Sequence, residues 1–528
     1  MISGGAKAMT AAWLNIGDIL RVNARRFPDR MALKDARKTL TFRQYNERSC
    51  RLANGLLKMG IKKGDRLCIL SHNCLEFMEL YAATAKTGIV AVPINWRISP
   101  NDMEYVINDS DAKAVVVGEK FLETVNGFRP QIRSIQPGSF IAISDKAQEG
   151  YISYEAVLAS GSPDEPMSRA EPQDVWIQLY TSGTTGKPKG VVRTHESYTA
   201  FHLINAVDYG FTQHDYGLIV MPLCHVNSTF YSFVFTYLGG AVYVHREYNF
   251  DAAELLEIID REKITFTSLI PTHYALILSA PEAARRKFDG SSMKQILCSS
   301  APVRQQMKLD VMKFFRNAAL FEAYGSTEAG LVTLLRPEDQ LKKLGSIGQE
   351  CAGTDSLLIL DENKRPVKPG EIGELYSRGP MMFKEYYKMP EKTKASFAGE
   401  YFSAGDMASI DGDGYYHLVD RKANMIITGG EHVYPTEVEE IISKHPAVFD
   451  VAVIAVPHDK WGEAVKAVII LKEGQKATEK EIIDFCAEKG MASFKKPKSV
   501  DFIKPEQMPR TGTGKILHRV LRERYHKG

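Results

Sequence analysis

Cysteine is scarce in this sequence, and long apolar runs are missing. The seven cysteines of the 528-residue chain are scattered at positions 50, 68, 74, 224, 298, 351 and 486. Their number is odd and no two form a C-x-x-C pair, so we expect free thiols in a reducing compartment, not a disulfide framework or a zinc site. No apolar run approaches the ~18 residues of a membrane span, so we expect no integral membrane segment. The N-terminus lacks a charged region followed by an apolar core, so we expect no secretory signal and a cytoplasmic protein.

A strong excess of charge of one sign is also missing. The chain carries 67 basic residues against 64 acidic residues, which gives a net charge of +3. Because so small a net charge creates no strong long-range field, we expect no nucleic-acid partner. With 44% hydrophobic and 25% charged residues, the composition is that of an ordinary globular protein. The length favours more than one domain.

Helical and strand patterns alternate along the chain. Residues 16–26, 41–59 and 75–87 have the apolar spacing of helices, and residues 66–70 and 89–93 predict short strands between them. This alternation indicates an α/β protein with a mostly parallel sheet covered by helices. Further strands are predicted at residues 175–179, 218–221, 264–270, 295–298 and 448–456, and further helices at residues 196–205, 437–443 and 480–489.

A loop rich in glycine and hydroxyl groups follows the strand predicted at residues 175–179. Residues 180–190 read YTSGTTGKPKG and contain three glycines, three threonines, one serine and two lysines. Glycines let the backbone approach a ligand closely, successive N–H groups and hydroxyls can surround phosphate oxygens, and lysines add positive charge. The spacing is not that of a Walker A loop, because Pro188 stands where serine or threonine should follow Lys187. A solvated turn is the alternative interpretation of the composition alone.

Three more segments carry residues suited to nucleotide chemistry. Residues 321–330 read FEAYGSTEAG, in which Tyr324 can stack on a base and Glu328 can supply a hard oxygen ligand for Mg2+. Residues 401–406 read YFSAGD and end in Asp406, whose carboxylate can accept two hydrogen bonds from a diol. Residues 509–515 read PRTGTGK and present Lys515 at the end of a glycine-containing loop.

The order and wording of these motifs resemble the adenylate-forming superfamily, which includes acyl-CoA synthetases, luciferases and the adenylation modules of peptide synthetases. The resemblance extends from near residue 15 to residue 520. It implies a large, multi-subdomain N-terminal domain, residues 1–420, with mostly parallel sheets covered by helices. It also implies a small, mobile α+β C-terminal domain, residues 421–528, that completes the active site.

The resemblance assigns roles to the motif residues. Lys515 is expected to be the adenylation lysine, Glu328 the Mg2+ ligand, and Asp406 the residue that holds the ribose hydroxyls. Arg421 is expected to reach the ribose or a phosphate. The expected ATP- and AMP-binding set is Thr181, Ser182, Gly183, Thr184, Thr185, Gly186, Lys189, Ser300, Ala301, Tyr324, Gly325, Thr327, Asp406 and Arg421.

The same resemblance predicts an acyl pocket and a catalytic role for His225. His225 is expected beside the substrate carboxylate, although a histidine after a buried strand can equally be a packed, hydrogen-bonded residue. No aspartate occurs between positions 224 and 237, where amino-acid-activating relatives hold the substrate ammonium, so a plain carboxylic acid is favoured. The expected pocket residues are His225, Asn227, Tyr231, Ser299 and Gly325, with Phe230 near the wall.

The C-terminal part resembles that of CoA ligases, with one departure at the hinge. Relatives usually carry aspartate or lysine at the hinge position, and this chain has Ala423. The departure puts the polarity of the hinge in doubt. The expected CoA-binding residues are Gly429, Gly430, Glu431, Phe494, Lys496 and Lys498. For the last three residues, an ordinary solvated turn is the alternative.

Together these features predict an ATP-dependent acyl-CoA synthetase that uses ATP, Mg2+ and CoA. The acid stays open among fatty, branched, aromatic and carnitine-like acids. One alternative is an adenylation enzyme that loads a carrier-protein thiol or performs luciferase-like oxidation. The other is a non-catalytic nucleotide-binding scaffold, against which the intact motifs speak. The resemblance also leaves a homodimer open.

Overall fold

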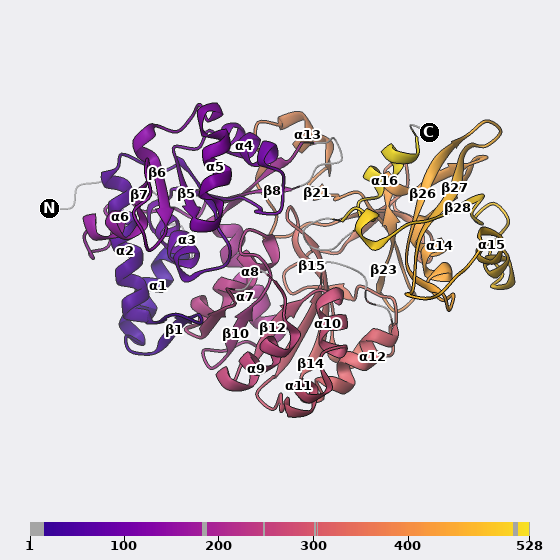
Figure 1. Cartoon of the computed structure of the whole chain (residues 1–528), viewed down its shortest axis with the longest axis horizontal. Coiled ribbons are helices and arrows are strands. Elements are labelled where there is room, and N and C mark those ends of the chain that lie inside the picture. The colour runs from indigo at the N-terminus through magenta and orange to yellow at the C-terminus, as the bar shows by residue number, and fades with distance from the viewer. Residues whose placement is uncertain are drawn as a thin grey trace. The chain divides into compact units, whose positions relative to one another are not determined.

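The chain forms two compact units in the computed structural model (Figure 1). The structure describes residues 15–181, 187–246, 249–299, 303, 305–510 and 516–526. Unit 1 comprises Met1–Leu344, Glu350–Ser356 and Arg378–Phe397, and unit 2 comprises Gly345–Gln349, Leu357–Ser377 and Ala398–Gly528. Because the chain passes between the units several times after residue 344, the domain boundary at residues 420–421 stays a prediction.

One sheet of unit 1 carries the strand that leads into the phosphate loop. Its strand order is β19-β9-β8-β4-β3-β5-β6-β7, parallel from β8 to β7 and antiparallel at β8-β9-β19. Side chains of β3 alternate between two cores, with Leu67 and Ile69 packed with α2 and α3, and Cys68 and Leu70 packed with α4 and α5. The strands are β3 (Arg66–Leu70), β4 (Val90–Pro93), β5 (Ala114–Gly118), β6 (Phe140–Ile143), β7 (Ile152–Ser153), β8 (Val175–Thr181), β9 (Lys189–Thr194) and β19 (Glu385–Tyr386).

A second sheet runs in the order β16-β15-β14-β13-β12-β10-β11-β1-β2. It is parallel from β14 to β1 and antiparallel at β14-β15 and β1-β2. The central strands β10, β11 and β12 are buried along their whole length, as is typical of parallel strands covered on both faces. The strands are β1 (Met31–Lys34), β2 (Thr39–Thr41), β10 (Tyr216–Ile219), β11 (Ala241–Val244), β12 (Phe266–Leu269), β13 (Gln295–Ser299), β14 (Ala319–Ser326) and β15 (Gly330–Leu335).

The helices of unit 1 begin and end at clear chemical signals. Thr41 and Gln44 form a reciprocal capping box at the start of α2, and Asp251 caps α9. None of the described helices is long and apolar enough to cross a bilayer. The helices are α1 (Ile16–Arg26), α2 (Phe42–Lys58), α3 (Leu75–Thr87), α4 (Pro100–Asp109), α5 (Leu122–Phe128), α6 (Tyr154–Ser160), α7 (His195–Tyr209), α8 (Val226–Leu238), α9 (Ala252–Glu262), α10 (Pro271–Leu278), α11 (Glu282–Lys287), α12 (Gln305–Phe314) and α13 (Pro390–Ala395).

The core of unit 1 fixes β8 from one side. Trp176 on β8 is fully buried, and its Nε1 donates to the carbonyl of Tyr81 on α3 at 3.1 Å. Its ring lies 5.2 Å from that of Phe233 on α8. These contacts hold the strand whose last residue is Thr181, so the entry to the phosphate loop is rigidly positioned.

Unit 2 consists of antiparallel strands covered by three helices in its described part. One sheet has the order β17-β18-β22-β23, and another has the order β25-β24-β27-β26 with β28 parallel to β27. Short strands β16 (Gln349–Glu350), β20 (Phe397–Ala398) and β21 (Tyr401–Phe402) lie at or near the points where the chain passes between the units. The other elements are β17 (Leu358–Leu360), β18 (Gly373–Tyr376), β22 (Asp406–Ile410), β23 (Tyr416–Arg421), β24 (Ile426–Thr428), β25 (Glu431–Val433), β26 (Val448–His458), β27 (Gly462–Leu471), β28 (Ser499–Phe502), α14 (Pro435–Ile442), α15 (Glu479–Glu488) and α16 (His518–Tyr525).

The predicted α/β class with mostly parallel sheets is confirmed. The helices expected at residues 16–26 and 75–87 have those bounds in α1 and α3, and the strand expected at residues 66–70 is β3. The strand expected at residues 175–179 is longer, because β8 continues in its pairing with β9 as far as Thr181.

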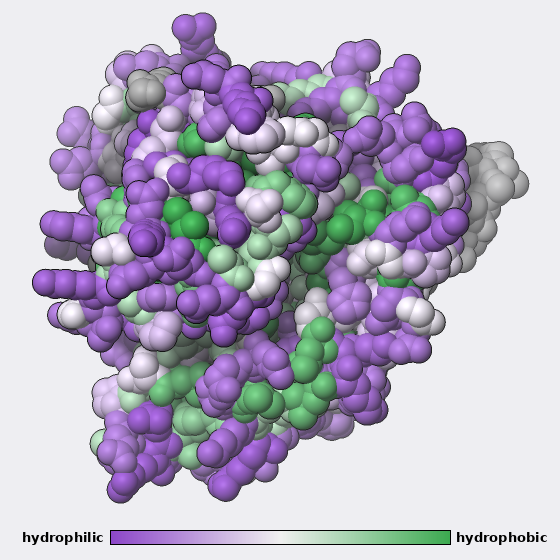
Figure 2. All heavy atoms as spheres, turned by 90° about the vertical axis from the view of Figure 1, so that its right-hand side faces the viewer, coloured by the Kyte–Doolittle hydropathy of each residue, from purple (hydrophilic) through white to green (hydrophobic). Residues whose placement is uncertain are grey.

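Hydrophilic residues cover most of the face in Figure 2, and hydrophobic residues form several separate groups between them.

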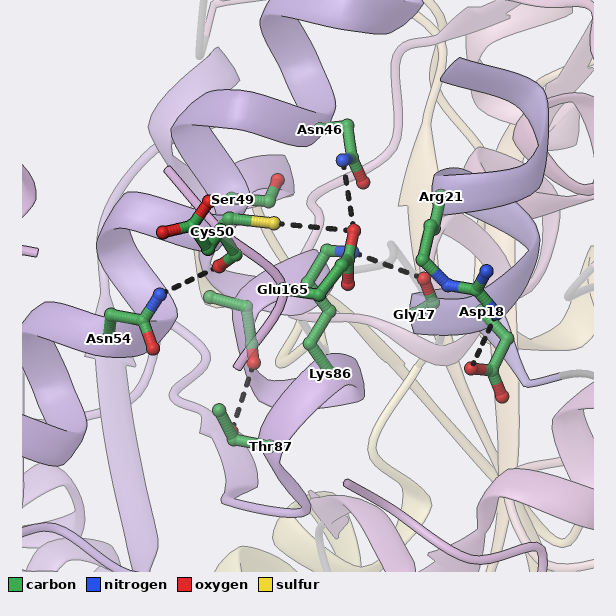
Figure 3. A network of polar contacts seen from close by, with 12 residues as sticks. Gly17, Asp18, Arg21, Asn46, Ser49, Cys50, Asn54, Lys86, Thr87 and Glu165 are labelled. Carbon is green, nitrogen blue, oxygen red and sulfur yellow. Dashed lines mark hydrogen bonds and ion pairs between the residues drawn. The ribbon is translucent and has the colours of Figure 1, made fainter. Parts of the chain in front are cut away.

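A buried lysine holds residues 161–170, the connection before β8, against three helices (Figure 3). The side chain of Lys86, in the last turn of α3, is 1% exposed and lies 2.9 Å from a carboxylate oxygen of Glu165. Its Nζ also donates to the carbonyl of Gly17 on α1 at 3.2 Å. Asn46 on α2 donates to Glu165 at 3.0 Å. This network ties α1, α2 and α3 to one connecting segment.

Replacing Lys86 with methionine is expected to lower the free energy of unfolding by about 2–3 kcal/mol. The change leaves the carboxylate of Glu165 and the carbonyl of Gly17 without their buried partner. Urea unfolding of the single variant and of the double variant Lys86→Met/Glu165→Gln measures the effect, and the double variant should recover part of the loss. Equal losses in both variants would contradict a buried ion pair.

The same pair has a defined pH dependence. Burial alone would raise the pKa of Glu165, but the charge and hydrogen bonds of Lys86 bring it below its ordinary value. The stabilisation by this carboxylate is therefore present above the pKa of the unfolded state and is lost as the pH falls through the folded-state pKa. The difference between wild type and Lys86→Met should shrink over that acid range.

Candidate active site

The ends of the predicted phosphate loop face each other across two strands. Thr181 ends β8, Lys189 begins β9, and these two residues are direct partners in the antiparallel pair. The two described ends of the loop therefore lie side by side at one end of this strand pair. The predicted phosphate-binding residues Ser182, Gly183, Thr184, Thr185 and Gly186 lie outside the described residues.

One tyrosine joins the phosphate-loop lysine to the predicted metal ligand. The Nζ of Lys189 lies 4.4 Å from the centroid of the Tyr386 ring, a cation–π distance. The hydroxyl of Tyr386 donates to Oε1 of Glu328 at 2.8 Å. Tyr386 lies on β19, which pairs with β9 through Tyr386 and Val191. Lys189 and Glu328 are 139 residues apart in the sequence. The structure brings both to Tyr386, with Lys189 over its ring and Glu328 at its hydroxyl.

Glu328 lies in the turn between β14 and β15, and Gly325 makes this turn possible. A Cβ at Gly325 would lie 2.1 Å from the carbonyl oxygen of Gly330, so any side chain would force the two strands apart. The resemblance predicts that Gly325 belongs to both the nucleotide site and the acyl pocket. The close approach of Gly330 is a second, structural reason for glycine. Tyr324 and Thr327 flank the same turn, with Tyr324 opposite Thr333 on β15.

Arg193 on β9 supports this turn, and the sequence did not predict this role. Its side chain on β9 is fully buried and donates from Nη1 to the carbonyl of Thr327 at 2.7 Å, and from Nη2 to the carbonyl of Met381. The guanidinium lies 4.9 Å from the centroid of the Phe230 ring. Burial lowers the pKa of Arg193 to about 10, which the charge of Glu328 partly opposes. Arg193 is therefore a cation that positions the residue next to Glu328.

Replacing Arg193 with lysine is expected to raise KM for ATP by about 10-fold or more, because lysine cannot hold two carbonyls in the fork geometry of arginine. Pyrophosphate exchange over a range of ATP concentrations measures this. Arg48→Lys is the matched control, since Arg48 is largely buried as well but pairs with Glu79 on α3 at 2.5 Å. If both variants lost only thermal stability, a positioning role for Arg193 would be wrong.

The predicted acyl-pocket residues meet where α8 begins and β12 and β13 end. Nδ2 of Asn227 donates to Oγ of Ser268 at 2.8 Å and to Oγ of Ser299 at 2.9 Å. His225 is the N-cap of α8, where its Nδ1 accepts from the backbone N–H of Asn227 at 3.4 Å. His225 is half-buried and hydrogen-bonded, and its catalytic role stays a prediction. The predicted residues Ser300 and Ala301 lie outside the described residues.

Two predicted nucleotide residues meet in unit 2. Asp406 at the start of β22 is the strand partner of Arg421 at the end of β23. An ion pair joins Nε of Arg421 to Oδ1 of Asp406 at 2.5 Å. Asp406 is 6% exposed, so the pair presents the guanidinium rather than the carboxylate to solvent. Their contacts with ribose and phosphate stay predictions.

The backbone around Ala423 is held by side chains from other elements. The carbonyl of Ala423 accepts from Nη2 of Arg522 on α16 at 2.7 Å. Asp420 accepts from the backbone N–H of Thr436 at 2.9 Å and so caps the first turn of α14. The main chain at Ala423 is therefore held by a hydrogen bond, and the role of this position as a hinge stays a prediction.

The described residues on either side of positions 511–515 are anchored. Arg510 and Ile516 form an antiparallel bridge, and Nε2 of His518 lies 2.9 Å from Oε1 of Glu439 on α14. Burial alone would lower the pKa of His518, but the contact with Glu439 raises it above its ordinary value. Lys515, the predicted adenylation lysine, lies outside the described residues.

The predicted CoA-binding residues fall into two groups with structural roles of their own. Gly429 and Gly430 connect β24 and β25 with φ angles of +61° and +87°, which a tight hairpin turn requires of glycine. Glu431 begins β25 directly after this turn. Phe494 packs at the edge of the unit 2 core, and Nζ of Lys498 donates to the carbonyl of Ser493 at 3.1 Å. Lys496 lies between them in the chain, and contacts of these residues with CoA stay predictions.

Glu328 is the carboxylate that could hold a magnesium ion at this site. The described residues contain no group of three or more His, Cys, Asp or Glu side chains that could hold a metal. Glu328, oriented by Tyr386, fits the preference of Mg2+ for few protein carboxylates combined with phosphate oxygens.

The family model "AMP-binding enzyme" matches residues 20–387, and "AMP-binding enzyme C-terminal domain" matches residues 437–515. The chain belongs to the AMP-binding enzyme family, in its CoA-ligase branch.

Similar proteins cover nearly the whole chain. A feruloyl-CoA synthase of Amycolatopsis is 33% identical over 95% of this chain and 97% of its own length. The long-chain-fatty-acid–CoA ligase FadD13 of Mycobacterium tuberculosis is 34% identical over 97% of this chain and 98% of its own length. The structure of the anthranilate CoA ligase AuaEII in complex with anthranoyl-AMP superposes with a TM-score of 0.88 at 27% identity, covering 98% of each chain.

Proposed function

We propose that this protein is an ATP-dependent acyl-CoA synthetase. It converts a carboxylic acid to an acyl adenylate with release of pyrophosphate, and then transfers the acyl group to the thiol of CoA. The observation that carries the proposal is the convergence of Lys189 and Glu328 on Tyr386 at the end of the phosphate loop. The proposal is supported by relatives that match nearly the whole chain and are named as a CoA synthase and a CoA ligase.

The first half-reaction must bring two anions together, the substrate carboxylate and the α-phosphate of ATP. Placing positive charge where negative charge develops is often the largest catalytic contribution. Lys189 and the loop hydroxyls bind the departing pyrophosphate, and Lys515 bridges the carboxylate and the α-phosphate. Bound Mg2+ supplies charge neutralisation, and Glu328 is the residue that would hold it.

The second half-reaction needs a thiol in place of Lys515 at the adenylate. By resemblance, residues 421–528 rotate between the two steps. The main-chain contact of Ala423 with Arg522 supports a hinge that works without a polar side chain. Gly429, Gly430 and Glu431 would then line the pantetheine path.

We also propose that the protein is cytoplasmic. A homodimer is compatible with the family to which the chain belongs.

The two alternatives differ in their acceptor and in their chemistry. A carrier-protein-loading enzyme would share the first half-reaction, but the relatives' names favour CoA as acceptor. A non-catalytic scaffold has no need for a buried arginine supporting the turn that carries Glu328.

The proposal is tested by pyrophosphate release over a panel of carboxylic acids, each with CoA, with a holo carrier protein, and with neither. We expect rapid release that depends on CoA for one class of acid. Release that depends on the carrier protein would support the first alternative. No release with any acid would leave only a nucleotide-binding protein.

A further inference from the structure

Six aromatic side chains fill the space between α8 and the second sheet of unit 1. They come from α7, α8, β12, β14 and the turn after α7, and each is less than 7% exposed. We call this group the aromatic plug; it consists of Tyr209, Phe211, Tyr231, Phe235, Phe266 and Phe321. Interiors pack without gaps of molecular size, so this group leaves no passage between its members.

The rings contact one another in a continuous series. The Tyr209 ring lies 4.7 Å from that of Phe321 and 5.1 Å from that of Phe211. The Tyr231 ring lies 5.3 Å from that of Phe266, and the hydroxyls of Tyr231 and Tyr209 are 3.1 Å apart. At the far end, Phe235 presses on the backbone of β10, where a Cβ at Gly217 would lie 2.2 Å from its ring.

The plug begins at Tyr231, the predicted pocket residue one helical turn after Asn227 on α8. Asn227 and Tyr231 are four residues apart in sequence on α8 and therefore share one face of the helix. Asn227 reaches Ser299, and Ser299 pairs with Ala323, the residue before Tyr324. An acyl group bound between Asn227 and the Tyr324–Glu328 turn would therefore have Tyr231 one helical turn further along α8.

Polar groups lie next to the plug, where α8 begins and β12 and β13 end. The buried amide of Asn227 uses Nδ2 for Ser268 and Ser299, and its Oδ1 accepts from no group among the described residues. An acceptor in this position suits a hydroxyl or amino substituent on the acid.

We propose that the substrate is a compact carboxylic acid, about the size of one substituted ring, and that the aromatic plug excludes long-chain fatty acids. The inference rests on the proposed synthetase function. A longer chain could enter only if Tyr231 or Phe266 left its buried position, which would break the ring contacts and the Tyr231–Tyr209 hydrogen bond. Tyr231 is the residue that sets the length limit.

The test measures kcat/KM with benzoate, 4-hydroxybenzoate, 4-hydroxycinnamate and the straight-chain acids butanoate, octanoate, dodecanoate and hexadecanoate. In the wild type, dodecanoate should give a value at least ~100-fold below the best aromatic acid, the order of effect of an acyl group that does not fit. Tyr231→Ala should narrow that ratio at least ~10-fold by opening the plug. Tyr231→Phe keeps the ring and should keep the length limit.

Tyr274→Ala is the matched control. Tyr274 is equally buried, but it packs in a different core with α9, α10 and α12, and its hydroxyl donates to the carbonyl of Leu297 at 3.0 Å. Its loss should lower stability without changing the ratio between dodecanoate and the aromatic acid. Should Tyr231→Ala fail to fold, Tyr231→Leu opens the plug less and is measured in the same way.

Each outcome has a distinct meaning. A wild-type enzyme that prefers dodecanoate or hexadecanoate overturns the inference and leaves the synthetase function standing. An unchanged ratio in a folded Tyr231→Ala or Tyr231→Leu variant overturns the role of the plug. An enzyme that releases pyrophosphate with none of these acids or the wider panel overturns the proposed function and, with it, the inference.

Discussion

Replacing Glu328 with glutamine is expected to lower the rate of acyl-adenylate formation about 1,000-fold, equivalent to about 4 kcal/mol of transition-state stabilisation. Glutamine keeps the size of the side chain and can still accept the hydrogen bond from Tyr386. It lacks the charge with which the carboxylate would hold Mg2+ beside the phosphates. ATP–pyrophosphate exchange with the best acid measures the effect.

Two further variants separate the metal role from a structural role. Tyr386→Phe removes the hydrogen bond to Glu328 but keeps the ring beside Lys189, so its loss should be about 10-fold or less. Glu322→Gln changes a carboxylate on β14, the strand before this turn, that instead pairs with Lys308 at 2.5 Å, and it should affect stability more than exchange. Wild-type exchange by Glu328→Gln at low Mg2+ concentration would rule out the metal role.

Replacing Lys515 with alanine is expected to lower adenylation by about 1,000-fold or more while largely sparing thioester formation from supplied acyl adenylate. The reason is that the lysine neutralises the approach of carboxylate and α-phosphate, a repulsion that is absent once the adenylate exists. Single-turnover measurements of the two half-reactions, with acid plus ATP and with acyl adenylate plus CoA, give the two rates separately.

Lys476→Ala is the control for this variant, because Lys476 is an exposed lysine of unit 2 that belongs to none of the predicted motifs. It should leave both half-reactions unchanged. If Lys515→Ala slowed both half-reactions equally, the specific assignment of Lys515 to adenylation would be refuted.

The fold was predictable because its signals are local. The apolar spacing of residues 16–26 and 75–87 depends only on which face of a helix is buried, and α1 and α3 have those bounds. Strand ends were less predictable, since pairing with a neighbour decides them. The strand expected at residues 264–270 is Phe266–Leu269 in β12, and β8 extends to Thr181 through its pairing with β9.

The supporting residues of the site were not predictable because their partners are distant in sequence. Arg193 contacts Thr327 across 134 residues, and Tyr386 contacts Glu328 across 58 residues. The one sequence signal for Arg193 is a charged residue inside an otherwise buried strand, where it needs partners for its donors. Ala423 differs from the residue that relatives usually carry at the hinge, which the sequence shows. Its hydrogen-bond partner Arg522 lies 99 residues away and could not be predicted.

The central claim is that the acid is activated as an adenylate and then transferred to CoA. The most direct test uses an acid labelled with oxygen-18 in its carboxylate, with ATP and CoA, and identifies the products by mass spectrometry. We expect acyl-CoA, AMP and pyrophosphate in equal amounts, with one labelled oxygen transferred to AMP. Unlabelled AMP, or ADP and phosphate as products, would contradict activation through an acyl adenylate.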